Sequence, residues 1–211
     1  MNKSLKCILP VMIFLIIISG IIPVEAVVEK QSSSSSLEQN FQKAKENYLK
    51  KDLNSAAAEI SKSADYLKSE AAKATGKGKE ALTASANELD KLAERVKKGT
   101  VKSEKTLETY FARVDKAMAE NYYIKATESW ARKEEKKAGE NLEKSINYLR
   151  SGLARSGKKI ERATNETINK SKELSLKLKE ETKLVADDVR KGFKDTENEI
   201  EKLGKKISSR D

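Results

Sequence analysis

The sequence predicts an all-α protein, an antiparallel bundle of five or six long helices built from two copies of a helical unit of about 82 residues. Three observations support this prediction. Charged residues make up 36% of the 211 residues, aromatic residues 5%, and only 2 are proline, a composition typical of long helices. Apolar residues recur at intervals of three and four, which is the period of a helix. The segment from Ile60 also matches, without a gap, the segment from Leu142.

The match extends outward from these two segments at a constant offset, the one that separates Ile60 from Leu142, which we call the repeat offset. At this offset Tyr48 aligns with Trp130, Tyr66 with Tyr148, Leu92 with Leu174, and Phe111 with Phe193. An ungapped similarity at a fixed period indicates a duplicated structural unit. We therefore expect one helical repeat over residues 37–118 and a second over residues 119–208, which bury matching apolar faces against each other.

The N-terminus predicts export. Lys3 and Lys6 precede an almost wholly apolar stretch over residues 8–22, and small residues end at Ala26. This is the pattern of a signal peptide over residues 1–26, cleaved near Ala26 to release the protein into the periplasm or the extracellular space. An uncleaved membrane anchor is the alternative, because residues 7–24 are just long enough to cross a bilayer. After cleavage no cysteine remains, so the exported protein forms no disulfide.

The next segment predicts a linker and then a helix. Residues 27–36 include five consecutive serines and no apolar periodicity, so we expect a flexible linker. Ser36 is followed by Gln39 at the spacing of a capping box, which predicts a helix start there. The helix continues to about Asp52 with one apolar stripe, which consists of Leu37, Phe41, Ala44 and Tyr48.

The rest of the first copy predicts three more helices. A stripe over residues 56–74 ends at Gly76 and Gly78, which favour a reversal. A helix over residues 79–98 follows and ends at Gly99. Thr100 then caps a helix that continues toward Trp130.

The second copy has fewer interruptions. We expect a hairpin at residues 156–158, because Gly157 aligns beside the glycine turn of the first copy. Gly192 is a second, weaker place for a break. The periodicity alone also allows one uninterrupted helix over residues 136–207.

The residue types exclude most catalytic chemistry. The chain has no histidine, and its single cysteine lies in the predicted signal peptide. This removes Ser-His and Cys-His nucleophiles and the usual zinc and haem sites. Neighbouring carboxylates such as Asp187 and Asp188 diverge by about 100 degrees on a helix rather than converging on a substrate. We therefore predict that the protein is not an enzyme and binds no cofactor or metal.

Basic residues near the two predicted turns form a candidate anion-binding site. The formal net charge of +10 favours anionic partners, although interleaved charges are also typical of a solvated surface. If both turns lie at one end of the bundle, they form one basic tip for an anionic membrane or polysaccharide surface. The absence of interleaved aromatic residues disfavours a specific nucleic-acid site. The candidate residues are Lys73, Lys77, Lys79, Arg155, Lys158, Lys159 and Arg162.

The densest aromatic cluster is a candidate partner-binding patch. It consists of Tyr122, Tyr123 and Trp130, and exposed Tyr and Trp side chains often anchor interfaces. The alternative is that these residues belong to the core. The sequence thus favours an exported, non-enzymatic helical scaffold or protein-interaction module of the cell envelope, which binds a partner protein or itself. The other hypothesis is a peripheral binder of anionic envelope surfaces.

Overall fold

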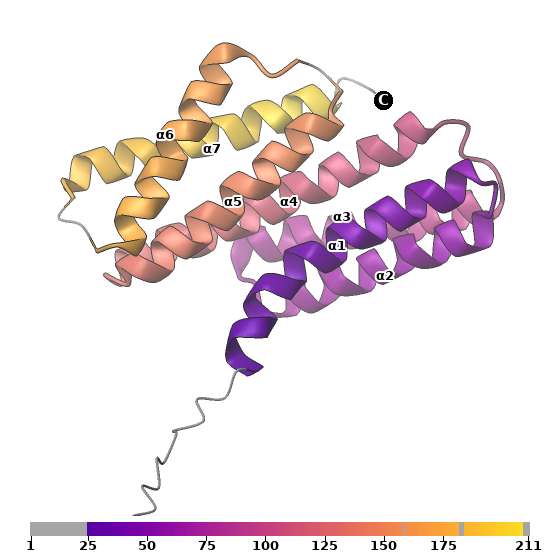
Figure 1. Cartoon of the computed structure of the whole chain (residues 1–211), viewed down its shortest axis with the longest axis horizontal. Coiled ribbons are helices and arrows are strands. Elements are labelled where there is room, and N and C mark those ends of the chain that lie inside the picture. The colour runs from indigo at the N-terminus through magenta and orange to yellow at the C-terminus, as the bar shows by residue number, and fades with distance from the viewer. Residues whose placement is uncertain (1–24, 158, 182–183, 209–211) are drawn as a thin grey trace, which may run out of the picture. The chain divides into compact units, whose positions relative to one another are not determined.

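A computed structural model describes residues 25–157, 159–181 and 184–208 (Figure 1). The chain divides into a unit of Met1–Ser33 and a unit of Ser34–Asp211, and the second unit holds the helical bundle. The prediction of an all-α fold is confirmed, because the described residues form helices and no strands. In this part of the chain the helices are α1 (Glu25–Leu49), α2 (Leu53–Ala72), α3 (Gly76–Lys97), α4 (Glu104–Ala131), α5 (Glu135–Arg155), α6 (Arg162–Lys179) and α7 (Ala186–Ser208).

Residues 119–208 contain more helix breaks than the sequence predicted. The hairpin at residues 156–158 is confirmed, because α5 ends at Arg155 and Gly157 has a φ of 61°. The alternative prediction of one uninterrupted helix over residues 136–207 is therefore wrong. Gly192 lies inside α7, and the second break instead falls between α6 and α7, where Glu181 has a φ of 52°. A non-glycine residue in the left-handed region gives no sequence signal. The expected five or six helices become seven within the described ranges.

The N-terminal expectations differ from the structure where they can be compared. Helix α1 begins at Glu25, so residues 27–36 are helical rather than a linker, and Ser36 lies inside the helix instead of capping it. This stretch contains neither glycine nor proline, and a helix that is stabilised by packing from Leu37 onward propagates through it. The predicted signal peptide lies outside the described residues except for its last two positions.

Helix α4 is the element on which most of the others pack. It has 28 residues and contacts α3, α5 and α7, and Phe111 of α4 stacks on Phe41 of α1 with ring centroids 4.1 Å apart. Figure 1 shows the α2–α3 hairpin on one side of the antiparallel pair α4 and α5, and the α6–α7 hairpin on the other. The apolar faces of all these helices meet in one continuous core.

The predicted apolar stripes form this core. Ile60, Leu67, Leu89, Leu149 and Leu203 are each 1% exposed or less. Fully buried side chains of this size each contribute about 1.5–3 kcal/mol relative to exposure. The three-and-four spacing therefore identified the buried face of each helix, including helices whose ends it misplaced.

Helix boundaries recur at the repeat offset found in the sequence. It separates the first residues of α2 and α5, and likewise those of α4 and α7. The left-handed residues Lys51 and Lys133 stand at the same offset, as do Gly99 and Glu181. The stacked pair Phe41–Phe111 has its counterpart in Tyr123–Phe193, whose centroids are 6.2 Å apart.

Candidate functional site

The α2–α3 turn carries the first group of candidate anion-binding residues. Lys77 and Lys79 lie in the first turn of α3 and are exposed, and no ion pair forms on either of them within the described residues. Lys73 is exposed as well, but its ammonium group contacts Glu70 at 3.2 Å. The turn therefore presents two lysines to solvent and a third that is partly neutralised.

The α5–α6 turn carries the second group, and its members occupy different environments. Lys159 is exposed. Arg162 is exposed and contacts Glu166, one helical turn further along α6, at 2.8 Å. Lys158 lies outside the described residues. Arg155 is directed into the bundle, where its side chain is only 12% exposed.

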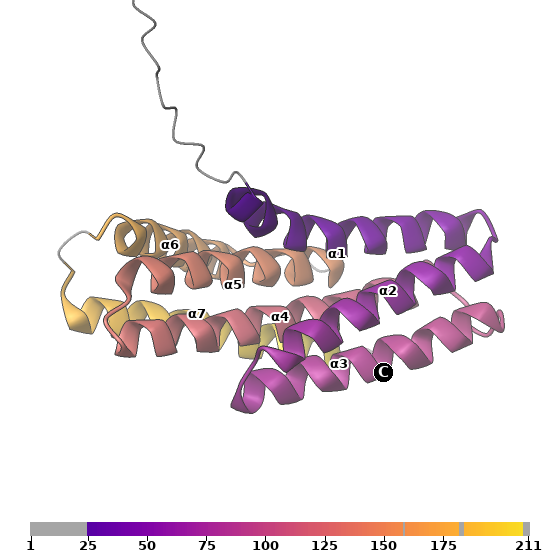
Figure 2. The ribbon, with the colours of Figure 1, turned by 90° about the horizontal axis from the view of Figure 1, so that it is seen from below.

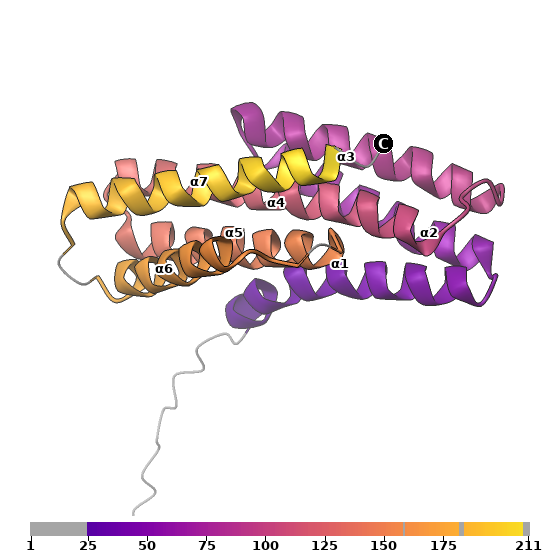
Figure 3. The ribbon, with the colours of Figure 1, turned by 90° about the horizontal axis from the view of Figure 1, so that it is seen from above.

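The two turns do not form one basic tip. Thr75 in the α2–α3 turn donates to Glu128 near the end of α4 at 3.0 Å, whereas Arg155 beside the α5–α6 turn donates to Glu108 near its beginning at 3.1 Å. These two glutamates are about 20 residues apart on one helix, which corresponds to about 30 Å along its axis. Figures 2 and 3 place the two turns on opposite sides of α4.

The aromatic cluster is part of the core. Tyr122 is 6% exposed and stacks on Tyr148, with ring centroids 5.8 Å apart. Burial raises the pKa of Tyr122, and nearby Glu70 raises it further. Tyr123 and Trp130 are partly buried against the core, and burial raises the pKa of Tyr123 to about 12. The exposed patch expected from the sequence is therefore wrong for Tyr122.

The most elaborate polar arrangement among the described residues is an ion cluster around Arg155, which sequence reasoning missed. The Arg155 guanidinium donates from Nε to Asp115 at 2.9 Å, from Nη1 to Glu108 at 3.1 Å and from Nη2 to Glu38. The guanidinium also lies over the rings of Phe41 and Phe111, 5.2 and 5.8 Å from their centroids. We call Glu38, Glu108, Asp115 and Arg155 the Arg155 cluster; it joins α1, α4 and α5.

The local sequence explains how Arg155 reaches the carboxylates. Gly152 lies three residues earlier on the same face of α5, and a Cβ atom there would lie only 3.2 Å from Cβ of Asp115 and 2.7 Å from Leu203. The missing side chain lets α5 approach α4 and α7 closely. On α4, Glu108, Phe111 and Asp115 share one face through their spacing of three and four.

The Arg155 cluster contains three carboxyl groups and one cation. Asp115 is 1% exposed, and burial raises its pKa to about 8, against the lowering effect of Arg155, while Glu38 and Glu108 raise it further. Burial lowers the pKa of Arg155, but Asp115, Glu38 and Glu108 together outweigh burial and raise it. Three carboxylates share one guanidinium, so the protonated form of Asp115 is favoured.

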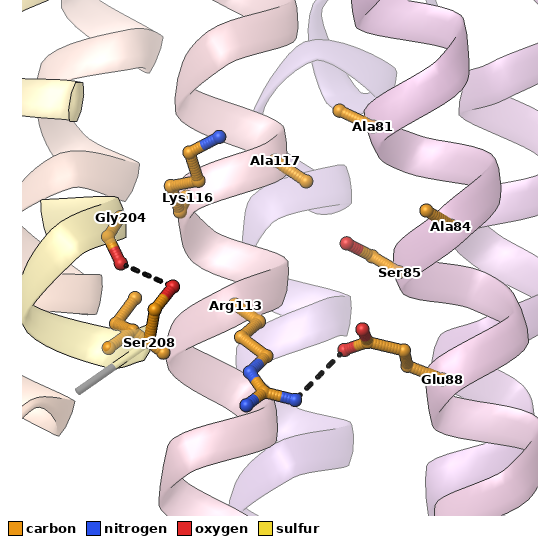
Figure 4. A pocket seen from close by; sticks show the side chains of 10 residues that line it. Ala81, Ala84, Ser85, Glu88, Arg113, Lys116, Ala117, Gly204 and Ser208 are labelled. Carbon is orange, nitrogen blue, oxygen red and sulfur yellow. Dashed lines mark hydrogen bonds and ion pairs between the residues drawn. The ribbon is translucent and has the colours of Figure 1, made fainter. Parts of the chain in front are cut away.

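A groove opens between α3 and α7, with α4 as its floor (Figure 4). Its volume is about 390 Å³, and small residues form most of its lining: Ala81, Ala84 and Ser85 on α3, Ala117 on α4, and Gly204 and Ser208 on α7. Arg113 donates to Glu88 across one end at 3.5 Å. Small residues leave the helix backbones close to solvent, so side chains of another helix can enter.

No group of three or more metal-ligating side chains that could hold an ion occurs in residues 25–157, 159–181 and 184–208. Over the same ranges, no helix combines the length and apolar character needed to cross a membrane. Comparison of the chain with protein-family models, with curated proteins and with solved structures found no match.

Proposed function

We propose that this chain is an exported, non-enzymatic helical interaction module of the cell envelope that binds a partner protein through the α3–α7 groove. The groove carries the proposal, because it is open, is lined mostly by small side chains and is formed by three helices. Export rests on the signal-peptide pattern of residues 1–26.

We further propose that the module arose by duplication of one helical unit, over residues 37–118 and 119–208. The recurrence of helix starts, left-handed turn residues and aromatic pairs at the repeat offset supports this proposal. Under this interpretation α4 ends the first copy and begins the second.

A photo-crosslinking residue placed at Ala84 tests the groove. In cells that make the protein, the Ala84 variant should form one discrete covalent adduct with a partner, because this exposed position lines the groove. The same residue at Ala131, exposed at the end of α4 and about 20 Å along that helix from Ala117 in the groove, is the control. Equal adducts at both positions, or none at Ala84, would contradict a partner site in the groove.

Adsorption to anionic envelope surfaces is the second candidate, favoured by the exposure of Lys77, Lys79 and Lys159. Since the two turns are separated along α4, each would contact the surface independently. Binding to vesicles with anionic lipid should then weaken at least about tenfold between about 50 and about 500 mM salt, because the charges are screened. The double substitution Lys77→Gln and Lys79→Gln should lower binding at low salt, and salt-insensitive binding would argue against this function.

A further inference from the structure

We propose that the Arg155 cluster is a pH-sensitive latch that holds the Ser34–Leu49 part of α1 against α4 and α5 and loosens as the solution becomes alkaline. The cluster is the place where these three helices exchange charged hydrogen bonds, with Glu38 from α1, Glu108 and Asp115 from α4, and Arg155 from α5. One guanidinium therefore fixes the position of α1 relative to the other two helices.

The cluster adds charged contacts to the apolar burial that also holds α1, which involves Leu37, Phe41, Ala44 and Tyr48. The Arg155 guanidinium lies beside the stacked rings of Phe41 and Phe111, 5.2 and 5.8 Å from their centroids, so the same cation contacts the main aromatic anchor of α1. Lys45, one turn further, contacts Glu104 and Glu108 at 2.9 and 3.0 Å and continues the charged seam along α4. A change of charge in the Arg155 cluster therefore affects two contacts of α1, the aromatic contact of Phe41 and the ion pairs of Lys45.

The charged groups around Asp115 are two carboxylates and two cations. From α1 it faces Glu38, from α4 Glu108, and from α5 Arg155, with Lys144 and Tyr148 lining the adjoining pocket of about 300 Å³. Helix α7 contributes the uncharged Leu203 at this point. With Glu104 and Lys45 included and Asp115 ionised, four carboxylates stand against three cations.

The direction of the response follows from the titration of Asp115. Its pKa of about 8 means that it carries a proton at pH 6 and is ionised at pH 9. Ionisation adds a buried negative charge beside Glu38 and Glu108, which repels the carboxylate that α1 contributes. Release of α1 would expose Leu37 and Phe41, now 1% exposed, and uncover the facing surface of α4.

Distance measurement between spin labels tests the latch. In the full chain with Cys7→Ser, labels at Lys43→Cys on α1 and Arg150→Cys on α5 occupy exposed positions. At pH 6 we expect one narrow distance distribution, and at pH 9 a second, longer population. A distribution that stays unchanged from pH 6 to pH 9 would overturn the proposal.

Two variants distinguish the release of α1 by the Arg155 cluster from a general loosening of the bundle at high pH. Asp115→Asn keeps the shape of the side chain without the titrating proton, so the distribution should stay narrow at both pH values. Glu197→Gln, a partly buried position that the repeat offset relates to Asp115, should leave the response of the wild type intact. A second label pair at Lys62 and Lys91, on α2 and α3, should not change with pH. Broadening in that pair, or an unchanged pH response in Asp115→Asn, would count against the latch.

Discussion

Gly139→Ala should destabilise the protein by about 3 kcal/mol, measured as the free energy of unfolding in urea, because overpacking a close helix crossing forces the backbones apart. A Cβ atom at Gly139 would lie 2.6 Å from the carbonyl oxygen of Ser175 and 2.8 Å from the amide nitrogen of Lys179. Both atoms belong to the backbone of α6, so no side-chain rotation relieves the clash.

Gly204→Ala is the matched control for this prediction. A Cβ atom there would meet only Cε of Lys116, at 3.3 Å, the far end of a flexible side chain. The substitution should therefore be neutral or stabilise the protein by up to about 1 kcal/mol through helix propensity. Similar losses in the two variants would mean that the α5–α6 crossing is not the cause.

Arg155→Met should have an effect of similar size, a loss of about 3–5 kcal/mol in the free energy of unfolding at pH 7, because Glu108 loses its cation and folding must then protonate Asp115 without the lowering effect of Arg155 on its pKa. Asp115 is 1% exposed and bonded to Arg155 at 2.9 Å, and Glu108 shares the same guanidinium. Methionine preserves the apolar contact with Phe41 and Phe111. Urea unfolding of the two proteins measures the loss.

Adding Asp115→Asn to Arg155→Met should recover at least about 1 kcal/mol of this loss, because folding no longer has to protonate Asp115. The raised pKa of Asp115 determines how the stability of the protein changes with pH. The stability that Asp115 contributes is full below its unfolded value of 3.8 and is lost as pH rises through about 8. The single variant Asp115→Asn should thus gain stability over the wild type between pH 5 and pH 9. A double variant no more stable than Arg155→Met would contradict the charge argument.

Periodicity predicted the buried faces well, because burial of an apolar stripe depends on spacing within a single helix. Ile60, Leu67 and Leu149 all occupy the core as expected. The glycine at 157 also marked its turn correctly, since a left-handed residue after a helix is most often glycine. The turns at Lys133 and Glu181 carry no such mark, and only the repeat offset relates them to Lys51 and Gly99.

The candidate site was less accessible to sequence reasoning. From the sequence alone Arg155 is predicted to be a surface cation, because its acidic partners lie 40, 47 and 117 residues away in the chain. The three-and-four spacing of Glu108, Phe111 and Asp115 hinted at a mixed face on α4, but nothing in the sequence brings α1 to the same place. Tyr122 was misjudged for the same reason, since its burial depends on Tyr148 from another helix.

Helix α4 passes without interruption from the first half of the bundle into the second. The two halves therefore have no hinge between them, and melting either one frays a helix that the other requires. We expect such a protein to unfold as one cooperative unit, in which a distortion of one half is transmitted through α4 to the other. Limited proteolysis should therefore not split it into two stable fragments.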